Sequence, residues 1–196
     1  MRKAALVGIG IAALLALGHS YNGLVHLDQA VWAQWGQVAN AYQRRTDLVP
    51  NLVDAVKGAA AFEKDTFAQV ADARAKVAQS SGERRQQVLS DPEAFKRAQQ
   101  AQDELSSTLS RLMAVSERYP DLKASTRFRD LQMQLEGTEN RITVERMRFS
   151  DAAQAFDATR ASFPTLVVAS FFGRRFCEKP YFQVQASSNI APKMKF

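Results

Sequence analysis

The sequence is poor in the residues from which enzymes most often build reactive sites. Its 196 residues include one cysteine, Cys177, and two histidines, His19 and His26. A lone cysteine excludes an intrachain disulfide, and a thiol becomes reactive only where its neighbours lower its pKa. Both histidines lie beside an apolar run, so a catalytic triad would have to recruit one of them far from any folded pocket. The sequence therefore predicts no catalytic centre, no metal and no cofactor.

Strong charge of one sign is also lacking. The 26 basic residues only modestly outnumber the 20 acidic ones, for a net charge of +6. The two signs are interspersed, which is typical of solvated helix faces. No basic block alternates with aromatic side chains, as binding of nucleic acid requires. We therefore expect no nucleic-acid partner, and the absence of lysine and arginine from residues 19–43 argues against a basic stripe for lipid or envelope polymers.

One long apolar run is present, at residues 4–18. As a helix it covers about 22 Å, short of a hydrocarbon core of ~30 Å. Tyr21 and the apolar residues after it continue the helical pattern, and an interfacial tyrosine with local thinning of the bilayer closes the gap. The run is either a signal peptide cleaved after Gly18 or a retained signal anchor. We favour the anchor, a transmembrane segment over residues 1–20 that contacts the lipid bilayer through residues 4–18.

The orientation of this segment follows from the basic residues around it. Arg2 and Lys3 precede the apolar run, whereas residues 19–43 carry no lysine or arginine. The positive-inside rule therefore predicts a single-pass protein of the bacterial cell membrane with a cytoplasmic N-terminus and an extracytoplasmic main domain. One face of the run holds only small side chains, which favours close approach of two helices and a homo-oligomer. These residues are Ala4, Gly8, Ala12 and Ala16.

Beyond the anchor, apolar residues recur at the spacing of helices. Pro50 lies within this pattern and predicts a kink or a break. A turn is expected from Gly58 to Glu63, and residues 80–82 interrupt the pattern. Residues 90–93, Ser-Asp-Pro-Glu, predict a helix start, and residues 119–121, Tyr-Pro-Asp, predict a helix end.

The last long helix has the most regular apolar stripe. Its positions step three, four, three, four, which is typical of helices packed nearly parallel in a bundle. They are Phe128, Leu131, Leu135, Thr138, Ile142, Glu145, Phe149, Ala152, Phe156, Thr159 and Phe163. Pro164 is expected to end this helix. Residues 21–164 are therefore predicted to form a helical bundle, and residues 165–196 an irregular arm packed on it.

Several stretches of the chain resemble the LemA family. They read YNGLVHLD at residues 21–28, YQRRTDLVPNLV at 42–53, YPDLK at 119–123 and LEGTENRI at 135–142. The resemblance covers almost the whole part beyond the anchor. It implies an all-α protein in which an N-terminal transmembrane helix is followed by an antiparallel four-helix bundle. It implies no enzymatic activity.

Two charged residues fall on apolar stripes, Arg45 and Glu145. A buried charge is costly unless it is paired, so we expect Arg44 or Arg45 to meet Glu136, Glu139 or Glu145 across the core. Asn51 and Asn140 would complete such a layer. The alternative is that the same residues line a groove for an acidic partner. The candidate set is Arg44, Arg45, Asp47, Asn51, Glu136, Glu139, Asn140 and Glu145.

The preferred function is a non-enzymatic scaffold or adaptor that presents a helical surface at the membrane to another membrane or envelope protein. The alternative is an envelope enzyme that uses the carboxylates of Glu136 and Glu139. That enzyme requires a concave pocket at these residues, with strongly shifted carboxyl pKa values.

Overall fold

The computed structural model describes residues 2–57, 64–81, 85–173 and 175–182. These residues form seven α-helices, namely α1 (Arg2–Lys57), α2 (Lys64–Ser81), α3 (Arg85–Ser90), α4 (Pro92–Ser116), α5 (Pro120–Ala124), α6 (Thr126–Ala161) and α7 (Thr165–Phe171). The described ranges contain no strand, so the prediction of an all-helical protein is confirmed. The expected turn from Gly58 to Glu63, the break at Gly82 and the end of the arm lie outside these ranges.

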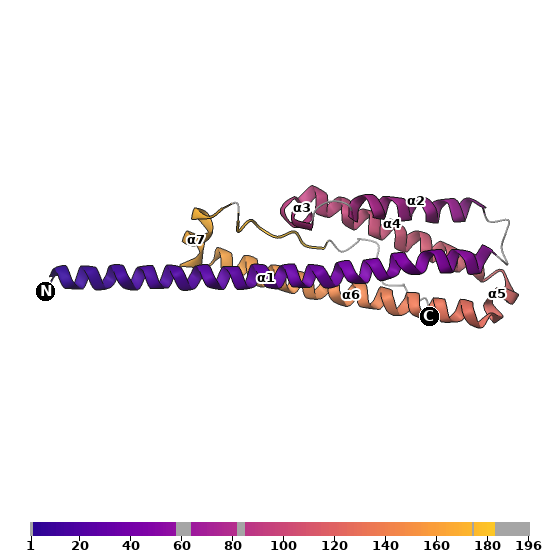
Figure 1. The fold of residues 1–196 in the computed structure, drawn as a ribbon, viewed down its shortest axis with the longest axis horizontal. Coiled ribbons are helices and arrows are strands. Elements are labelled where there is room, and N and C mark those ends of the chain that lie inside the picture. Colours follow the sequence, from indigo (N-terminus) through magenta and orange to yellow (C-terminus); the bar gives the residue numbers. More distant parts are fainter. Residues whose placement is uncertain (1, 58–63, 82–84, 174, 183–196) are drawn as a thin grey trace, which may run out of the picture.

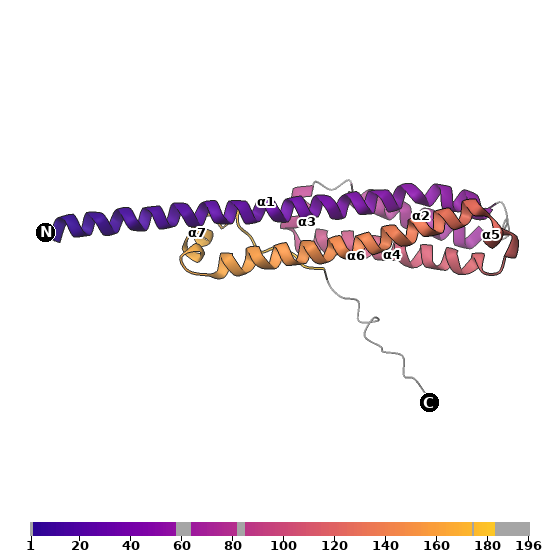
Figure 2. The same ribbon diagram turned by 90° about the horizontal axis from the view of Figure 1, so that it is seen from below.

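Helix α1 is 56 residues long, and its N-terminal part projects beyond all the other helices (Figures 1 and 2). The apolar side chains of this part are exposed, among them Leu6, Ile9 and Leu14. By length and composition alone, α1 is the one helix in the described ranges that is able to cross a membrane. The predicted long apolar N-terminal helix is therefore present. Within its small-residue face, Gly8, Ala12 and Ala16 are exposed, and the side chain of Ala4 lies outside the description.

Of the kink or break predicted at Pro50, the break is wrong, because α1 continues through this residue to Lys57. Pro50 has no amide to donate to the carbonyl of Thr46, so one backbone hydrogen bond is missing. Val49 and Leu52, on either side of the proline, are both buried. We infer that this packing holds the helix together where the hydrogen bond is lacking.

The long helices pack as two antiparallel pairs, α1 with α6 and α2 with α4 (Figures 1 and 2). Two apolar clusters form the core. The cluster nearer to the projecting part of α1 contains Trp35, Phe95 and Phe149, whose ring centroids lie 5.5–5.9 Å apart. The cluster at the far end contains Leu52 of α1 and Leu105 of α4 among its members. Each cluster draws side chains from both helix pairs, which joins the pairs into one folded unit.

The predicted start of α4 is confirmed. Asp91 caps the helix through a hydrogen bond from the backbone amide of Glu93 to its carboxylate at 3.0 Å, and Pro92 is the first helical residue. The chain after Tyr119 differs from the prediction, because Pro120 opens the short helix α5 instead of a simple turn. Proline is well suited to a first helical position, where its missing amide costs nothing.

The apolar stripe of α6 is buried as predicted along most of its length, from Phe128 to Phe156. Three positions at its end differ, of which Thr159 is only half-buried. Ala153 is buried in place of Ala152, and Phe163 is 84 % exposed beyond the end of the helix at Ala161. A strict seven-residue repeat drifts by about 20° per heptad around a straight α-helix. By the third heptad of α6, the buried position has therefore moved from Ala152 to its neighbour Ala153.

The C-terminal arm begins as helix, so the prediction of an irregular segment fails for α7 and agrees with the described residues after it, up to Phe182. Phe176 and Lys179 of the arm are buried. The Lys179 ammonium donates to the Asp28 carboxylate of α1 at 2.5 Å. On α6, the Arg160 guanidinium donates to the carbonyl of Phe176 at 2.7 Å. The arm is thus tied to both α1 and α6.

Candidate functional site

A buried arginine lies at the centre of the folded part. Arg45 of α1 is 0 % exposed, at a position that the apolar stripe would otherwise fill. Its Nη1 donates to Glu139 Oε1 of α6 at 2.8 Å and to Ser106 Oγ of α4. Its Nη2 donates to the backbone carbonyl of Gln102 at 2.9 Å and to the side-chain oxygen of the same residue. Both Nη atoms are therefore paired and hydrogen-bonded, as a buried charge requires, whereas Nε is buried without a hydrogen-bond partner among the described residues.

A second polar layer lies one helical turn away. The Tyr42 hydroxyl accepts a hydrogen bond from Nε of Arg146 at 2.7 Å, and Nη2 of Arg146 donates to the Asp103 carboxylate at 2.8 Å. Burial raises the pKa of Tyr42 to about 12, although the neighbouring guanidinium of Arg146 opposes this shift. The phenol is therefore neutral at physiological pH, and it serves as an acceptor between two helices.

These layers separate the two apolar clusters. On α1 the first cluster ends at Tyr42 and the second begins at Val49, with Arg45 between them. On α6 the same gap lies between Leu135 and Ile142. A slip of one turn between α1 and α6 would carry Arg45 away from Glu139 and place its charge against apolar side chains. We infer that the polar layer fixes the register of the two helices, a role that buried polar groups have in some systems.

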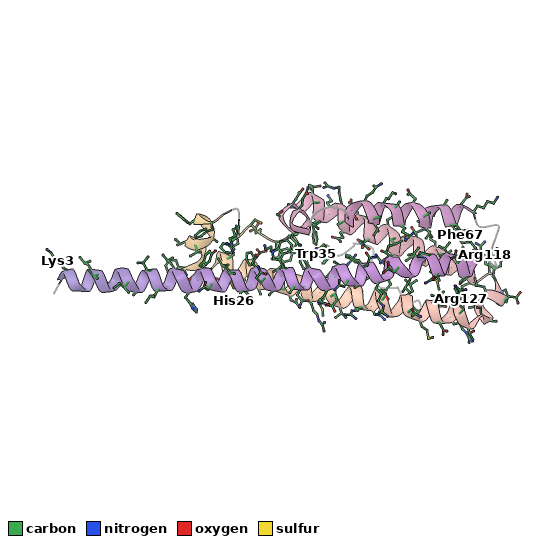
Figure 3. The ribbon with its side chains drawn as sticks, viewed as in Figure 1. Lys3, His26, Trp35, Phe67, Arg118 and Arg127 are labelled. Carbon is green, nitrogen blue, oxygen red and sulfur yellow. The ribbon has the colours of Figure 1, made fainter. Side chains whose placement is uncertain are left out.

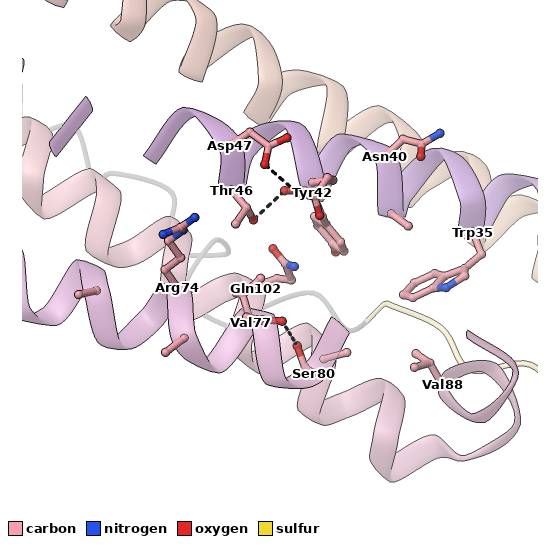
Figure 4. Close-up of a pocket in the computed structure, with 16 residues that line it drawn as sticks. Trp35, Asn40, Tyr42, Thr46, Asp47, Arg74, Val77, Ser80, Val88 and Gln102 are labelled. Carbon is pink, nitrogen blue, oxygen red and sulfur yellow. Dashed lines mark hydrogen bonds between the residues drawn. The ribbon is translucent and has the colours of Figure 1, made fainter. Parts of the chain in front are cut away.

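A cleft of about 800 Å³ opens beside this layer, between α1 and α2 (Figure 4). Its walls carry small side chains at Ala39, Ala71 and Ala75, which leave the space between the helix pairs unfilled. Arg74 of α2 and Gln102 of α4 point into the space (Figure 4). The remaining lining residues include Trp35, Asn40, Tyr42, Gln43, Thr46, Asp47, Val77, Ser80 and Val88.

The cleft and the polar layer share a residue. Gln102 lines the cleft and also accepts a hydrogen bond from Arg45. On the opposite wall, the Gln43 amide donates to the Asp47 carboxylate at 2.7 Å, one turn along α1. The surface of the cleft thus consists of alanine methyl groups, the ring of Trp35, the hydrogen-bonded pair of Gln43 and Asp47, and Gln102, which also binds Arg45. Such a surface suits a polypeptide segment with mixed polar and apolar side chains.

The structure brings together only part of the predicted candidate set. Arg45 meets Glu139, whereas Arg44 and Glu136 are exposed. Glu145 is buried, but the cations beside its carboxylate are those of its own helix, Arg148 at 3.2 Å and Arg141 at 3.9 Å. The far oxygen of Glu145 has no hydrogen-bond partner among the described residues.

Asn51 and Asn140 do not complete the layer, and both are exposed. Asn140 follows Glu139 directly and so lies about 100° away around α6, while Asn51 is six positions beyond Arg45 and lies on another face of α1. Their expected places are taken by Gln102 and Ser106 of α4, which the sequence analysis missed. The only signal was their position beside Leu105 on the apolar stripe of that helix.

The carboxylates required by the alternative enzyme hypothesis do not line the cleft. Glu136 is exposed and accepts a hydrogen bond from Gln132, and Glu139 is occupied by Arg45. Within the described ranges, no group of three or more His, Cys, Asp and Glu side chains is placed to hold a metal ion. The histidines point away from the folded interior, as His26 shows in Figure 3.

Comparison with known proteins identifies relatives of this chain. The chain is 26 % identical over 188 residues to magnetosome protein MamQ of Magnetospirillum gryphiswaldense, which covers 87 % of this chain and 69 % of that protein. It is also 26 % identical over 201 residues to magnetosome proteins MamQ 1 and MamQ 2 of Paramagnetospirillum magneticum, covering 94 % of this chain and 73 % of each relative. Residues 34–196 match the LemA family. The chain belongs to the LemA family.

Proposed function

We propose that this protein is a membrane-anchored scaffold or adaptor. The N-terminal part of α1 spans the cell membrane with its N-terminus in the cytoplasm, and the remaining helices stand outside as an antiparallel four-helix bundle. The observation that carries the proposal is the continuity of α1. A single helix contains the exposed apolar run, the buried Arg45 and one wall of the cleft, so the cleft is held at a defined height above the membrane.

The partner in this proposal is another membrane or envelope protein, which inserts a segment into the cleft. The chemistry of the lining supports a polypeptide, since the cleft combines Trp35 and alanine side chains with the polar groups of Asn40, Gln43 and Arg74. Aromatic and arginine side chains are enriched at the centres of protein interfaces. Self-association through the small-residue face of α1 is a separate proposal, which adds a second copy in the membrane.

The anchor is tested by labelling full-length protein in cells whose outer membrane has been made permeable. Cys177→Ser removes the native thiol, and a single cysteine is then placed at exposed Met147 or inserted between Met1 and Arg2, so that both basic residues are kept. A membrane-impermeant maleimide is expected to label Met147→Cys while the inner membrane is intact and the inserted cysteine only after lysis. If Met147→Cys is protected from the maleimide, or if alkaline carbonate releases the protein from membranes, the proposed anchoring is wrong.

The cleft is tested by photo-crosslinking in the same cells. A photoreactive side chain replaces Asn40, which lines the cleft, or Met133, which is exposed on α6 outside it. We expect a discrete protein adduct from the Asn40 position and none from the matched Met133 position. The same adducts from both positions, or none from the cleft, would show that the cleft is not the partner site.

A further inference from the structure

The residues around α7 expose an unusual amount of apolar surface. Outside the N-terminal run of α1, the exposed large apolar side chains of the described residues fall into two groups. Four lie away from α7, at Met133, Val144, Met147 and Tyr181, and of these only Val144 and Met147 are neighbours, one helical turn apart on α6. The other five lie within ten consecutive residues, at Phe163, Leu166, Val167, Phe171 and Phe172. Single exposed apolar residues are normal, whereas a gathered patch marks a surface with a partner.

Helix α7 is apolar on both of its faces. Thr165, Val168 and Ala169 are buried against α1 and α6. The opposite face carries Leu166 and Phe171, and Phe171 is 83 % exposed. A helix on the surface of a water-soluble bundle would present polar side chains there. The apolar side chains on the outward face of α7 are therefore suited to contact with an apolar medium.

The position of α7 along α1 identifies that medium. Figure 1 shows α7 at the end of the folded part from which α1 projects. The Phe172 ring lies 5.2 Å from the Tyr21 ring of α1, and the Phe176 ring lies 5.7 Å from it. Residues 4–18 cover only about 22 Å, so a helix that spans a hydrocarbon core of ~30 Å needs about five further residues. Those five residues are 19–23, and Tyr21 among them lies at the level of α7.

A cation marks the same level. The Arg175 guanidinium lies 5.5 Å from the centre of the Tyr21 ring and 5.7 Å from that of Phe176. Its side chain is exposed, on the side of the arm that leads back to the bundle. Tyrosine and arginine side chains are typical of the headgroup zone, where an aromatic ring meets the apolar layer and a cation meets lipid phosphate. The exposed rings of α7 then lie at the boundary of the acyl chains.

We propose that residues 163–172 insert into the outer leaflet beside the anchor, so that the protein contacts lipid acyl chains through α7 as well as through α1. The inference rests on the proposed membrane anchor and adds a second, monotopic contact to it. Insertion of this kind is typical of short segments with aromatic side chains on the apolar face. It also compensates for the short apolar run, because the folded end itself enters the interface. The second contact restricts rotation and tilt of the bundle.

The test uses full-length protein with Cys177→Ser, reconstituted at low protein density in phospholipid bilayers. A nitroxide label is attached to Phe171→Cys or Phe163→Cys, to Leu14→Cys in the anchor, and to Met147→Cys as the matched exposed control on α6. Oxygen concentrates in the hydrocarbon layer and a polar nickel chelate stays in water. We expect the labels at Phe171 and Phe163 to be relaxed mainly by oxygen, as at Leu14, and the Met147 label mainly by the chelate. Circular dichroism confirms that each labelled protein is folded.

Each other outcome overturns the proposal in a recognisable way. If Leu14 is in lipid while Phe171 and Phe163 are relaxed by the chelate, the anchor stands and the second contact is wrong. If the α7 labels are shielded from both reagents, a second copy of the protein covers the patch instead of lipid. If Leu14 itself is in water, the proposed anchor fails and the inference fails with it.

Discussion

The ion pair of the buried arginine gives the sharpest test of the folded part, because the two members of the pair, Arg45 and Glu139, differ in their access to water. Arg45 is 0 % exposed, whereas 36 % of the Glu139 side chain is exposed. Glu139→Ala leaves a guanidinium in the interior without its counter-ion. Removing one partner of a buried pair costs about 3–5 kcal/mol. Since water reaches the Glu139 side, and Gln102 and Ser106 still accept hydrogen bonds, we reduce this to about 2–3 kcal/mol.

Arg45→Met should cost less than Glu139→Ala. Glu139 then turns to solvent, and the main penalty is the unpaired side-chain oxygen of buried Gln102, about 1–2 kcal/mol. In the double variant no charge is stranded, so its loss should fall short of the sum of the two single losses by about 1–2 kcal/mol. The free energies of unfolding are measured by urea titration of full-length protein in mild detergent, followed by far-ultraviolet circular dichroism.

The control for this cycle is Glu136→Ala, an exposed acid one turn earlier on the same helix. It should change the free energy of unfolding by no more than about 0.5 kcal/mol. Two results would refute the reasoning. One is strict additivity of Arg45→Met and Glu139→Ala, and the other is a larger loss from Arg45→Met than from Glu139→Ala.

Four other changes have defined outcomes. Phe149→Ala empties a fully buried ring position and should lower the free energy of unfolding by about 3–5 kcal/mol in the same urea titration. Tyr42 has its pKa raised from 10.0 to about 12, so the stability that it contributes is present below pH 10 and is lost as pH rises to 12. Tyr42→Phe should therefore remove a late-ionising phenol from the ultraviolet titration. Lys179→Ala breaks the ion pair with Asp28 and should speed chymotrypsin cleavage in the arm. Pro50→Ala restores a helical amide and should raise the free energy of unfolding by about 1–3 kcal/mol.

Matched variants separate these effects from general damage. Val144→Ala, at an exposed position five residues before Phe149, should leave the unfolding free energy nearly unchanged. Lys76→Ala removes a surface lysine and should not alter cleavage of the arm. Equal losses from Val144→Ala and Phe149→Ala would contradict the assignment of the aromatic core. A lower unfolding free energy for Pro50→Ala would show that the proline is needed for packing.

The helical architecture was predictable because it depends on the spacing of apolar residues along a single helix. The stripe of α6 and the cap of α4 at Asp91 are local patterns, and both appear in the structure. The limits of this approach appear at Pro50, where the packing of Val49 and Leu52 outweighs a local signal for a break. They appear again at Ala153, where the geometry of a real α-helix departs from an idealised repeat.

The candidate site was less predictable, since it requires knowledge of which helices meet and at what height. Arg45 was recognisable as a charge on an apolar stripe, and Glu139 was among its expected partners. Gln102 and Ser106 come from a third helix, and nothing in their local sequence shows that they face Arg45. The groove considered as the alternative was expected at the candidate set, but of that set only Asp47 lines the cleft. The place of the cleft was not predictable, because it depends on the spacing between helix pairs and not on any single residue pattern.

The polar layer and the proposed lipid contact of α7 are linked through the register of α1. The pairing of Arg45 with Glu139 sets how far α1 extends beyond the end of α6, and the pairing of Asp28 with Lys179 sets the same relation for the arm. One helical turn corresponds to about 5.4 Å. A slip of that size would strand both charges and, in the proposed membrane arrangement, would also move Phe171 away from the headgroup level. We therefore infer that, in this arrangement, the pair between Arg45 and Glu139 helps to set the height at which α7 and the cleft lie relative to the bilayer.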